Sequence, residues 1–237
     1  MSKRLAKQSN AGFSLIELLI AMTLTLTVMS IATVLLAQAL NVRTRTNSNN
    51  DALADAQRAL NIMSREISSA GFNLSGNGIV SGDTTTDVNG NSMIRVRSNL
   101  NKFDETASTT ARNEIGVAGE DAGEDIKYFV HKADNTNLLA RYDEYAEAGG
   151  SVTVLANRLD SLYIHYYAGK VSYGTSGCDV TGASGAEVSP SAAQYLVVAV
   201  CVQLGAIGTP GSAGYQPQHS VLLVSDVTLR NSNLPSY

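Results

Sequence analysis

The chain has 237 residues, of which 44% are hydrophobic and 16% are charged, and its formal net charge is -4. This length and apolar content suffice for one folded core, and no internal repeat is visible. The acidic balance argues against binding to nucleic-acid phosphates by simple electrostatics. Neither a phosphate-binding loop, nor a nucleophile elbow, nor an HExxH pattern occurs, so we expect no catalytic residues and no enzyme.

The chain begins with a short polar leader, residues 1–12, that carries three basic side chains. An apolar run follows with one acid, Glu17, near its start and no further charge until Arg43, which is long enough to cross a bilayer as a helix. Because positive flanks stay in the cytoplasm, we expect the residues after about Val42 to be exported.

Glu17 is an ionisable side chain in a segment that should lie in hydrocarbon. Such residues are costly and usually have a partner and a role. The apolar segment offers no Lys, Arg or His, so the remaining candidate is an α-amino group created by cleavage between Gly12 and Phe13, four residues from Glu17. In an axially shifted copy of the helix the same amine could also reach Glu17, and each charge would relieve the other's desolvation cost. The pattern therefore favours axial stacking of subunits.

The basic leader and the run Gly12-Phe13-Ser14-Leu15-Ile16-Glu17 resemble the class III leader of type IV pilin-like proteins. In that family a membrane-embedded prepilin peptidase cuts after the glycine, on the cytoplasmic face, and methylates the new terminal phenylalanine. The resemblance therefore implies cleavage between Gly12 and Phe13, N-methylation of Phe13, and an assembly role for Glu17 toward the terminus of a neighbouring subunit.

Two other interpretations of the apolar run remain open. An ordinary secretory signal is suggested by the A-x-A pattern Ala37-Gln38-Ala39, but the apolar part of such a signal is typically about 7 to 15 residues, shorter than this run, which also contains Glu17. A plain membrane anchor with an accidental acid accounts for the length and the basic flank, but not for the Gly12–Phe13 junction.

Helical patterning continues beyond the apolar run. Small and apolar residues recur at alternating spacings of three and four, typical of one buried helix face: Leu53, Ala56, Leu60, Met63, Ile67 and Ala70. No proline precedes Pro190, so nothing forces a kink. We expect one helix from Phe13 to about Ala70, ended by Gly71, with a membrane and filament-core part at 13–42 and an amphipathic part at 43–71.

The remaining residues, 72–237, carry strand and turn signals. Residues 73–91 are rich in Gly, Ser, Thr and Asn and predict an exposed loop. Strands are predicted at 93–96, 126–131, 138–142, 152–155, 162–167, 195–204 and 220–229. One long helix followed by strands predicts an α+β fold, in which the helix packs on a C-terminal antiparallel sheet. This order is also that of the pilin fold, and the resemblance places the β-rich domain in the periplasm.

The two cysteines, Cys178 and Cys201, have no second thiol nearby to form a CxxC pattern. In an oxidising compartment we expect a disulfide between them, which would contribute about 3 kcal/mol to stability in the chain-entropy model. Two buried free thiols are the alternative if the segment stays in a reducing cytosol.

Acidic side chains allow one metal hypothesis. Glu120-Asp121 and Glu124-Asp125 could together supply hard oxygen ligands to calcium. A solvated, self-repelling loop explains them better, so we predict no metal and no cofactor. The histidines lack catalytic or metal-ligand spacing and are expected to be solvated or packed on strands: His131, His165 and His219.

Within the pilin-like family the resemblance sharpens toward PilW-like minor pilins and the J-type pseudopilins of type II secretion. It rests on Gln57-Arg58-Ala59-Leu60, on residues 65–72, on a strand at 159–166 and on Val227-Thr228-Leu229-Arg230-Asn231. It implies a minor type IV pilin that primes or caps a filament. A secretion pseudopilin is the alternative, and a tip adhesin or DNA-uptake pilin is less favoured.

The same resemblance implies the partners and the location. The partners would be other major and minor pilins, the prepilin peptidase, and an inner-membrane assembly platform with a separate ATPase. No nucleic-acid partner is expected. The protein would be a single-pass inner-membrane protein with its C-terminal domain in the periplasm before assembly, and part of a pilus or pseudopilus afterwards.

Overall fold

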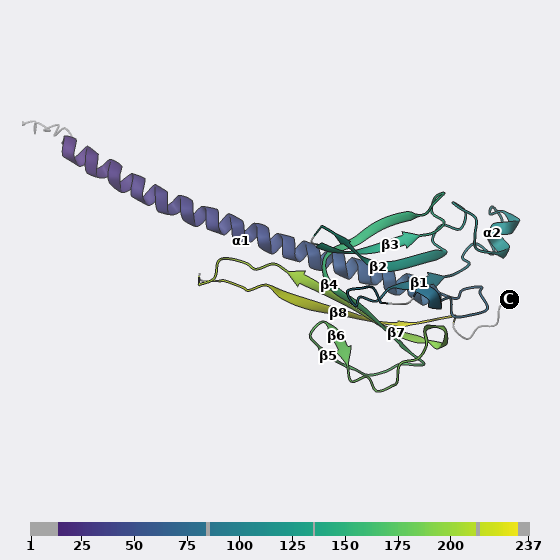
Figure 1. Cartoon of the computed structure of the whole chain (residues 1–237). Helices are drawn as coiled ribbons and strands as arrows, with labels where there is room; N and C mark the ends of the chain where they lie inside the picture. The colour runs from purple at the N-terminus through teal and green to yellow at the C-terminus, as the bar shows by residue number, and fades with distance from the viewer. Residues whose placement is uncertain (1–13, 84–85, 135, 212–213, 232–237) are drawn as a thin grey trace, which may run out of the picture. The chain divides into compact units, whose positions relative to one another are not determined.

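The computed structural model describes residues 14–83, 86–134, 136–211 and 214–231. The chain divides into two compact units, residues 1–46 and 47–237. Helix α1, Leu15–Ser69, begins in the first unit and ends in the second (Figure 1). Its expected first residue, Phe13, lies outside the described residues, and its observed end is one residue before the expected Ala70.

The second unit contains one main antiparallel sheet with the order β1-β2-β3-β4-β7-β8 (Figure 1). Its strands are β1 (Ile94–Arg97), β2 (Asp125–Ala133), β3 (Thr136–Asp143), β4 (Ser151–Tyr167), β7 (Tyr195–Leu204) and β8 (His219–Thr228). The smaller elements are η1 (Ser81–Asp83), α2 (Thr109–Asn113), β5 (Gly174–Ser176), β6 (Asp179–Thr181) and η2 (Pro190–Ala192). A helix packed on a C-terminal antiparallel sheet confirms the predicted α+β class. The sequence missed α2, β5 and β6, which are too short to show a period.

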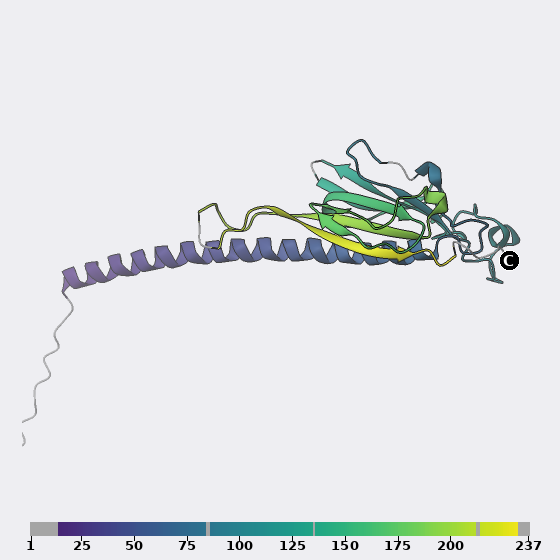
Figure 2. The ribbon, with the colours of Figure 1, turned by 90° about the horizontal axis from the view of Figure 1, so that it is seen from below.

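The predicted apolar stripe of α1 is the face that meets the sheet. Five predicted members are buried: Ala56, Leu60, Met63, Ile67 and Ala70. The sixth, Leu53, is partly buried, and Ala52 and Ala59, which were not predicted, are buried as well. The alanines let the sheet approach closely, while each large apolar side chain contributes roughly 1.5 to 3 kcal/mol by leaving water. Figure 2 shows β8 lying along this part of α1, where Arg230 N donates to Ser68 O at 3.2 Å.

Gly71 ends the helix, as the sequence predicted. Its φ of +79° lies in the left-handed region, which glycine adopts without steric cost. Its N–H donates to Arg97 O at 2.9 Å, and a Cβ at this position would lie 2.6 Å from Gly76 O. The turn thus brings residues 76–78 back against the helix end and the end of β1.

Strand β4 is one 17-residue strand, where the sequence predicted two. Its first half pairs with β3 and its second half, from Leu159, pairs with β7. Between the halves the register shifts, and Arg158 has a φ of +58°. The residues near Arg158, which lie between the two predicted strands, form an irregular part of one strand and redirect it from one partner to the other.

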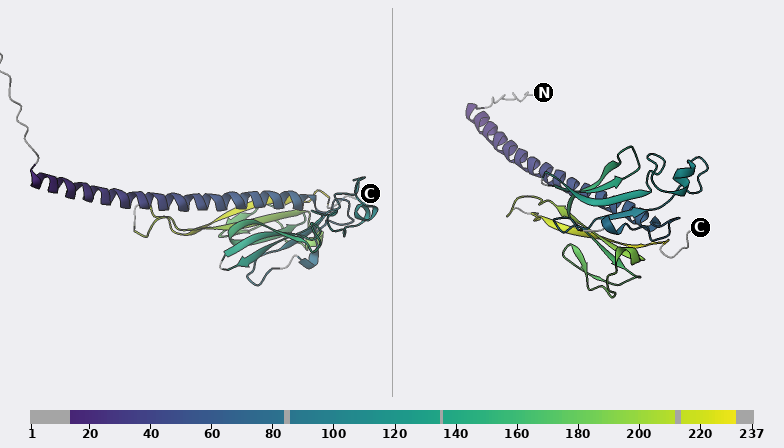
Figure 3. Two further views of the ribbon diagram at one scale, coloured as in Figure 1. Left: turned by 90° about the horizontal axis from the view of Figure 1, so that it is seen from above. Right: turned by 45° about the vertical axis from the view of Figure 1, so that its right-hand side comes forward.

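Strand β7 is buried along nearly its whole length, because both of its faces are covered. One face meets the core of α1, and the other packs with residues that include Tyr167 and Val180. The β5–β6 hairpin contributes to this second cover and lies below β7 and β8 in Figure 1 and in the right-hand view of Figure 3. Coverage of both faces explains the continuous apolar run that the sequence shows at 195–204.

Residues 73–91 form a loop with many exposed residues, as expected, but two of its asparagines are buried in the fold. Asn77 is buried and donates to Pro190 O at 2.7 Å and to Ala193 O at 3.0 Å. Asn91 is buried as well, and its Oδ1 accepts from Leu162 N at 3.2 Å. These Asn side chains form hydrogen bonds with buried backbone groups that would otherwise need a neighbouring strand as partner. The amino-acid composition of the segment does not reveal this role.

Candidate assembly helix and polar sites of the sheet domain

The first unit presents an apolar helix surface with no cover. Every described residue from Ser14 to Arg45 is exposed, although most of them are apolar. Helix α1 is long and apolar enough in this part to cross a membrane. A helix that is apolar all round is stable in a bilayer or against other helices, and not in water.

The threonines of this apolar segment have their hydroxyl groups bonded within the helix. Thr23 Oγ1 donates to Ile20 O at 2.9 Å, and Thr33 Oγ1 donates to Met29 O at 2.8 Å. Thr25 and Thr27 do the same. These hydroxyl groups therefore need no water, which suits them to a hydrocarbon environment.

Glu17 is the one charged residue between Ser14 and Val42. It is exposed, and in the described part of the chain its carboxylate has no hydrogen-bond or ion-pair partner. Gly12 and Phe13, where cleavage and methylation are expected, lie outside the described residues. The pairing of Glu17 with the amine of Phe13 therefore stays a prediction.

A polar contact fixes the second part of α1 to the sheet. Glu66 accepts a hydrogen bond from Tyr128 Oη and from Arg141 Nε, the latter at 3.0 Å. Tyr128 is fully buried, and this burial, together with the nearby Glu66 charge, raises the pKa of Tyr128. Arg141 Nη1 also lies 3.2 Å from Asp143 Oδ2, so Glu66, Tyr128, Arg141 and Asp143 form a small polar network. It aligns one helix face with β2 and β3.

Asp125 is held by arginines. Arg95 Nε lies 2.6 Å from Asp125 Oδ1, and Arg97 Nε lies 2.7 Å from Asp125 Oδ2. Arg95 also contacts Asp83 at 3.1 Å and Glu144 at 3.3 Å. Hydrogen bonding to Asp125 outweighs burial and raises the pKa of Arg95. Asp125 is thus occupied, and it is unsuited to the calcium role that the sequence allowed.

The solvated loop expected around the acidic residues was also wrong. Asp121, Glu124 and Asp125 are 0%, 2% and 1% exposed, and only Glu120 is at the surface. Glu120 Oε2 accepts from Ser108 N at 2.9 Å. The four carboxylates therefore do not converge as a set. Backbone amides hold the buried pair: Asp121 Oδ2 accepts from Gly116 N and Val117 N, both at 2.6 Å, and Glu124 Oε1 accepts from Asn101 N at 2.8 Å.

Cys178 and Cys201 form the disulfide expected from the sequence, with their Cα atoms 5.3 Å apart. It ties the β5–β6 turn to the buried strand β7. Asp160 lies beside it and accepts from Ser220 Oγ at 2.9 Å. Because the two sulfur atoms are bonded to each other, Asp160, Cys178 and Cys201 do not form a thiolate metal site.

His165 lies on strand β4, in line with the expectation of a strand-packed histidine, but it also pairs with two acids that the sequence did not reveal. Its Nδ1 lies 2.6 Å from Glu187 and its Nε2 lies 2.8 Å from Asp179. Burial lowers the pKa of His165, but hydrogen bonds to Asp179 and Glu187 outweigh it, so the pKa is raised. This side chain joins β4 to the segment that carries β5 and β6.

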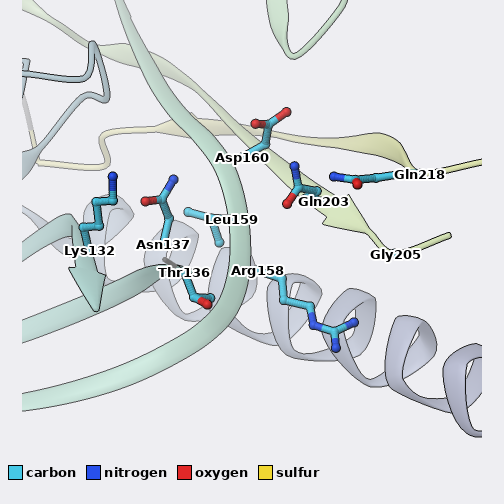
Figure 4. A pocket seen from close by; sticks show the side chains of 9 residues that line it. All are labelled: Lys132, Thr136, Asn137, Arg158, Leu159, Asp160, Gln203, Gly205 and Gln218. Atoms are coloured by element: carbon cyan, nitrogen blue, oxygen red, sulfur yellow. The ribbon is translucent and has the colours of Figure 1, made fainter. Parts of the chain in front are cut away.

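A polar pocket of about 530 Å³ lies where β4 changes partners (Figure 4). Its lining is Lys132, Thr136, Asn137, Arg158, Leu159, Asp160, Gln203, Gly205 and Gln218. Arg158 extends toward α1 in Figure 4, where its Nη1 donates to Asn49 Oδ1 at 3.4 Å. No nucleophile stands beside a general base among these lining residues, so the pocket has no recognisable catalytic arrangement.

The fold and the exposed apolar helix define a membrane-anchored protein with an α+β domain. Residues 7–33 match the prokaryotic N-terminal methylation motif. No curated protein and no solved structure matches the chain. The motif supports a type IV pilin-like prepilin, and with it processing by a prepilin peptidase and assembly with other pilins.

Proposed function

We propose that the protein is a minor type IV pilin, a structural subunit that primes or caps the pilus filament. The observation that carries this proposal is Glu17, one carboxylate in an uncovered apolar helix, four residues after the Phe13 of a methylation motif. A plain membrane anchor needs no such acid, whereas in a filament subunit the acid can pair with the terminal amine of a neighbouring subunit.

Glu17 would set the axial register of the subunits. Cleavage between Gly12 and Phe13 creates an α-amino group that can meet Glu17 in the same helix or in an axially shifted neighbour. Pairing the two charges relieves the desolvation cost of both. Apolar contact between helices, at about 25 cal/mol per Å², supplies the attraction, so the ion pair need only specify alignment.

We place the β-rich domain, residues 72–237, in the periplasm before assembly. The basic leader favours this orientation. The Cys178–Cys201 disulfide agrees with an oxidising compartment. In the filament this domain would contact major and minor pilins, while a separate ATPase of the inner-membrane platform supplies the energy of assembly.

A minor pseudopilin of type II secretion is the second candidate, because the methylation motif covers residues 7–33 and is shared by both classes of subunit. The two differ in their product. A pilin is recovered in fibres sheared from the cell surface, whereas a pseudopilin co-purifies with secretion components and its loss stops export of secreted proteins.

Replacing Glu17 by Val tests the assembly role. We expect normal cleavage and membrane insertion, and incorporation into sheared filaments lowered by at least about tenfold, which corresponds to 1.4 kcal/mol. Intact-mass measurement of the mature chain and immunoblots of filament fractions would report the two steps. Thr27→Val is the matched control, since it removes a polar atom of the same segment that is bonded within the helix.

Unchanged incorporation of the Glu17 variant would refute the assembly role. A mature chain that still begins at Met1, or that begins at Leu40, would refute the processing step. These two failures are separable, because the first is measured in filaments and the second on the purified chain.

A further inference from the structure

Strand β8 lies at one edge of the main sheet, and one row of its backbone groups points away from β7. Leu229 N donates to Gln194 O at 2.9 Å, and this bond identifies the row, because hydrogen-bonded pairs alternate along antiparallel strands. The odd-numbered residues of β8 therefore bond to β7. The outward row consists of Ser220, Leu222, Val224, Asp226 and Thr228. Each of these residues presents a backbone donor and a backbone acceptor at the edge of the sheet.

The fold covers two other open edges of this sheet with hydrogen-bond partners. Along β1, Val80 N donates to Arg95 O at 3.0 Å. Along the second half of β4, Ser92 N donates to Leu162 O at 2.7 Å. In the part of the chain that the structure describes, the outward backbone groups of β8 have no such partner. The edge of β8 is thus left open where two others are closed.

The sequence of β8 does not protect this edge. Natural edge strands are often short or carry lysine, proline or a bulge, which hinder pairing with another chain. β8 has 10 residues, contains no lysine and no proline, and pairs with β7 without a register shift. Its centre is the apolar run Val221-Leu222-Leu223-Val224, whose side chains are half-buried. A regular, apolar and open edge of this length is a template for one more strand.

A groove of about 540 Å³ beside the end of β8 adds a charge preference. It is lined by Ser64, Arg65, Ser68, Ser69, Asp226, Val227, Thr228 and Arg230. Arg65 and Arg230 are exposed, and neither forms an ion pair with another described residue. Asp226 already accepts a hydrogen bond from Tyr173 Oη at 2.6 Å. The two arginines therefore favour an incoming segment that carries an acid near this end of β8.

The direction of β8 argues against a second copy of this chain as the partner. β8 runs in the same direction as α1, since Ser225 Oγ lies 2.8 Å from Ser64 Oγ and, further along both elements, Arg230 N donates to Ser68 O at 3.2 Å. A two-fold pair of β8 strands is antiparallel, so it would point the two α1 helices in opposite directions. Two copies anchored in one membrane through α1 cannot adopt this arrangement.

We propose that the outward edge of β8 binds an extended segment of a different protein, which adds a strand to the sheet and places an acidic side chain near Arg65 and Arg230. Backbone hydrogen bonds would set the register of this segment, and its alternate side chains would pack on the apolar run of β8. The inference uses the membrane anchor and the sheet, and it does not depend on the pilin assignment.

The test uses the full-length chain in detergent and a fluorescent 10-residue peptide, matched to the length of β8. The peptide alternates valine and threonine and carries glutamate at both ends. It should bind with a Kd below about 1 mM, and hydrogen exchange should slow at residues 220–228. A peptide with lysine in place of glutamate should bind at least about threefold more weakly. If the glutamate peptide does not bind, or protects another part of the chain instead, the proposal is overturned.

Val224→Pro removes an outward N–H and keeps the bonds to β7, so we expect the variant to fold and to bind the peptide at least about tenfold more weakly. Leu223→Pro is the contrasting variant. It removes an N–H that bonds to β7, so its urea midpoint should fall far below that of Val224→Pro. Equal peptide binding by Val224→Pro and the natural chain would overturn the proposal.

Arg65→Glu tests the charge preference without touching the strand. It should make the lysine peptide the tighter ligand, and an unchanged preference would contradict the proposal. Lys132→Glu is the matched control, because Lys132 is exposed on β2, which β3, β4 and β7 separate from β8. A second copy as the partner would appear as a dimer of the natural chain in lipid nanodiscs that Val224→Pro abolishes. That result would overturn the assignment of a different protein.

Discussion

Gly78 is the position where the structure makes its sharpest stability prediction. A Cβ added there would lie 2.1 Å from Gly71 N and 2.4 Å from Arg97 O. Both atoms belong to the backbone and already bond to each other at 2.9 Å, so neither can move aside. Gly78 also has a φ of +75°, which disfavours any side chain. Gly78→Ala must therefore separate the helix end from β1.

Two other glycines divide this cost into its parts. Gly76 has open space around its Cβ position and is not among the glycines with positive φ. Gly90 has open space but a φ of +84°. We expect Gly76→Ala to change the unfolding free energy by less than about 1 kcal/mol, and Gly90→Ala to cost about 1 to 2 kcal/mol through its backbone conformation.

Gly78→Ala combines the steric collision with the cost of the backbone conformation. It should lower the unfolding free energy by more than about 4 kcal/mol, which single substitutions rarely do. Urea unfolding of the full-length chain, followed by circular dichroism, would rank the three variants. If Gly78→Ala falls within about 1 kcal/mol of Gly90→Ala, the close approach between the helix end and β1 does not exist and the account of the turn is wrong.

Two further predictions concern the segment that carries β5 and β6. Because the pKa of His165 is raised by its hydrogen bonds to Asp179 and Glu187, the pairing stabilises the fold below the ordinary histidine pKa and is lost as pH rises through the folded-state pKa. The urea midpoint of the natural chain should therefore fall as pH rises above about 6.5, and an equal fall in a His165→Gln variant would contradict this. Replacing Cys178 and Cys201 together by Ala should lower the unfolding free energy by about 3 kcal/mol, whereas unchanged urea midpoints would show that the bond does not constrain the unfolded chain.

The sequence predicted best where one physical demand acts on a whole element. The stripe of α1 repeats because one helix face is buried, and β7 is continuously apolar because both of its faces are covered. These demands act over many residues, so they leave a period or a run that can be read without knowing any partner. The end of α1 was predictable for a different reason, since glycine readily adopts the left-handed conformation that closes a helix.

Sites that depend on distant partners were not predictable. His165 meets Asp179 and Glu187, which are 14 and 22 residues away in the chain. The acids near residue 120 looked like a solvated cluster because their main partners are backbone amides, which every sequence contains. Arg158, where β4 changes partners, has no sequence signal, since a positive φ at arginine is imposed by the surrounding sheet.

One part of α1 is buried against the sheet and the other is exposed and apolar, so assembly and folding can be tested separately. Around Ala56 the helix is packed against its own sheet, so substitutions there act on the unfolding free energy. Around Glu17 the described side chains are exposed and contribute nothing to that core. Glu17→Val should therefore leave urea unfolding of the sheet domain unchanged while it lowers filament incorporation. A loss of domain stability in this variant would mean that its assembly defect reports misfolding, and the charge-pair argument would lose its support.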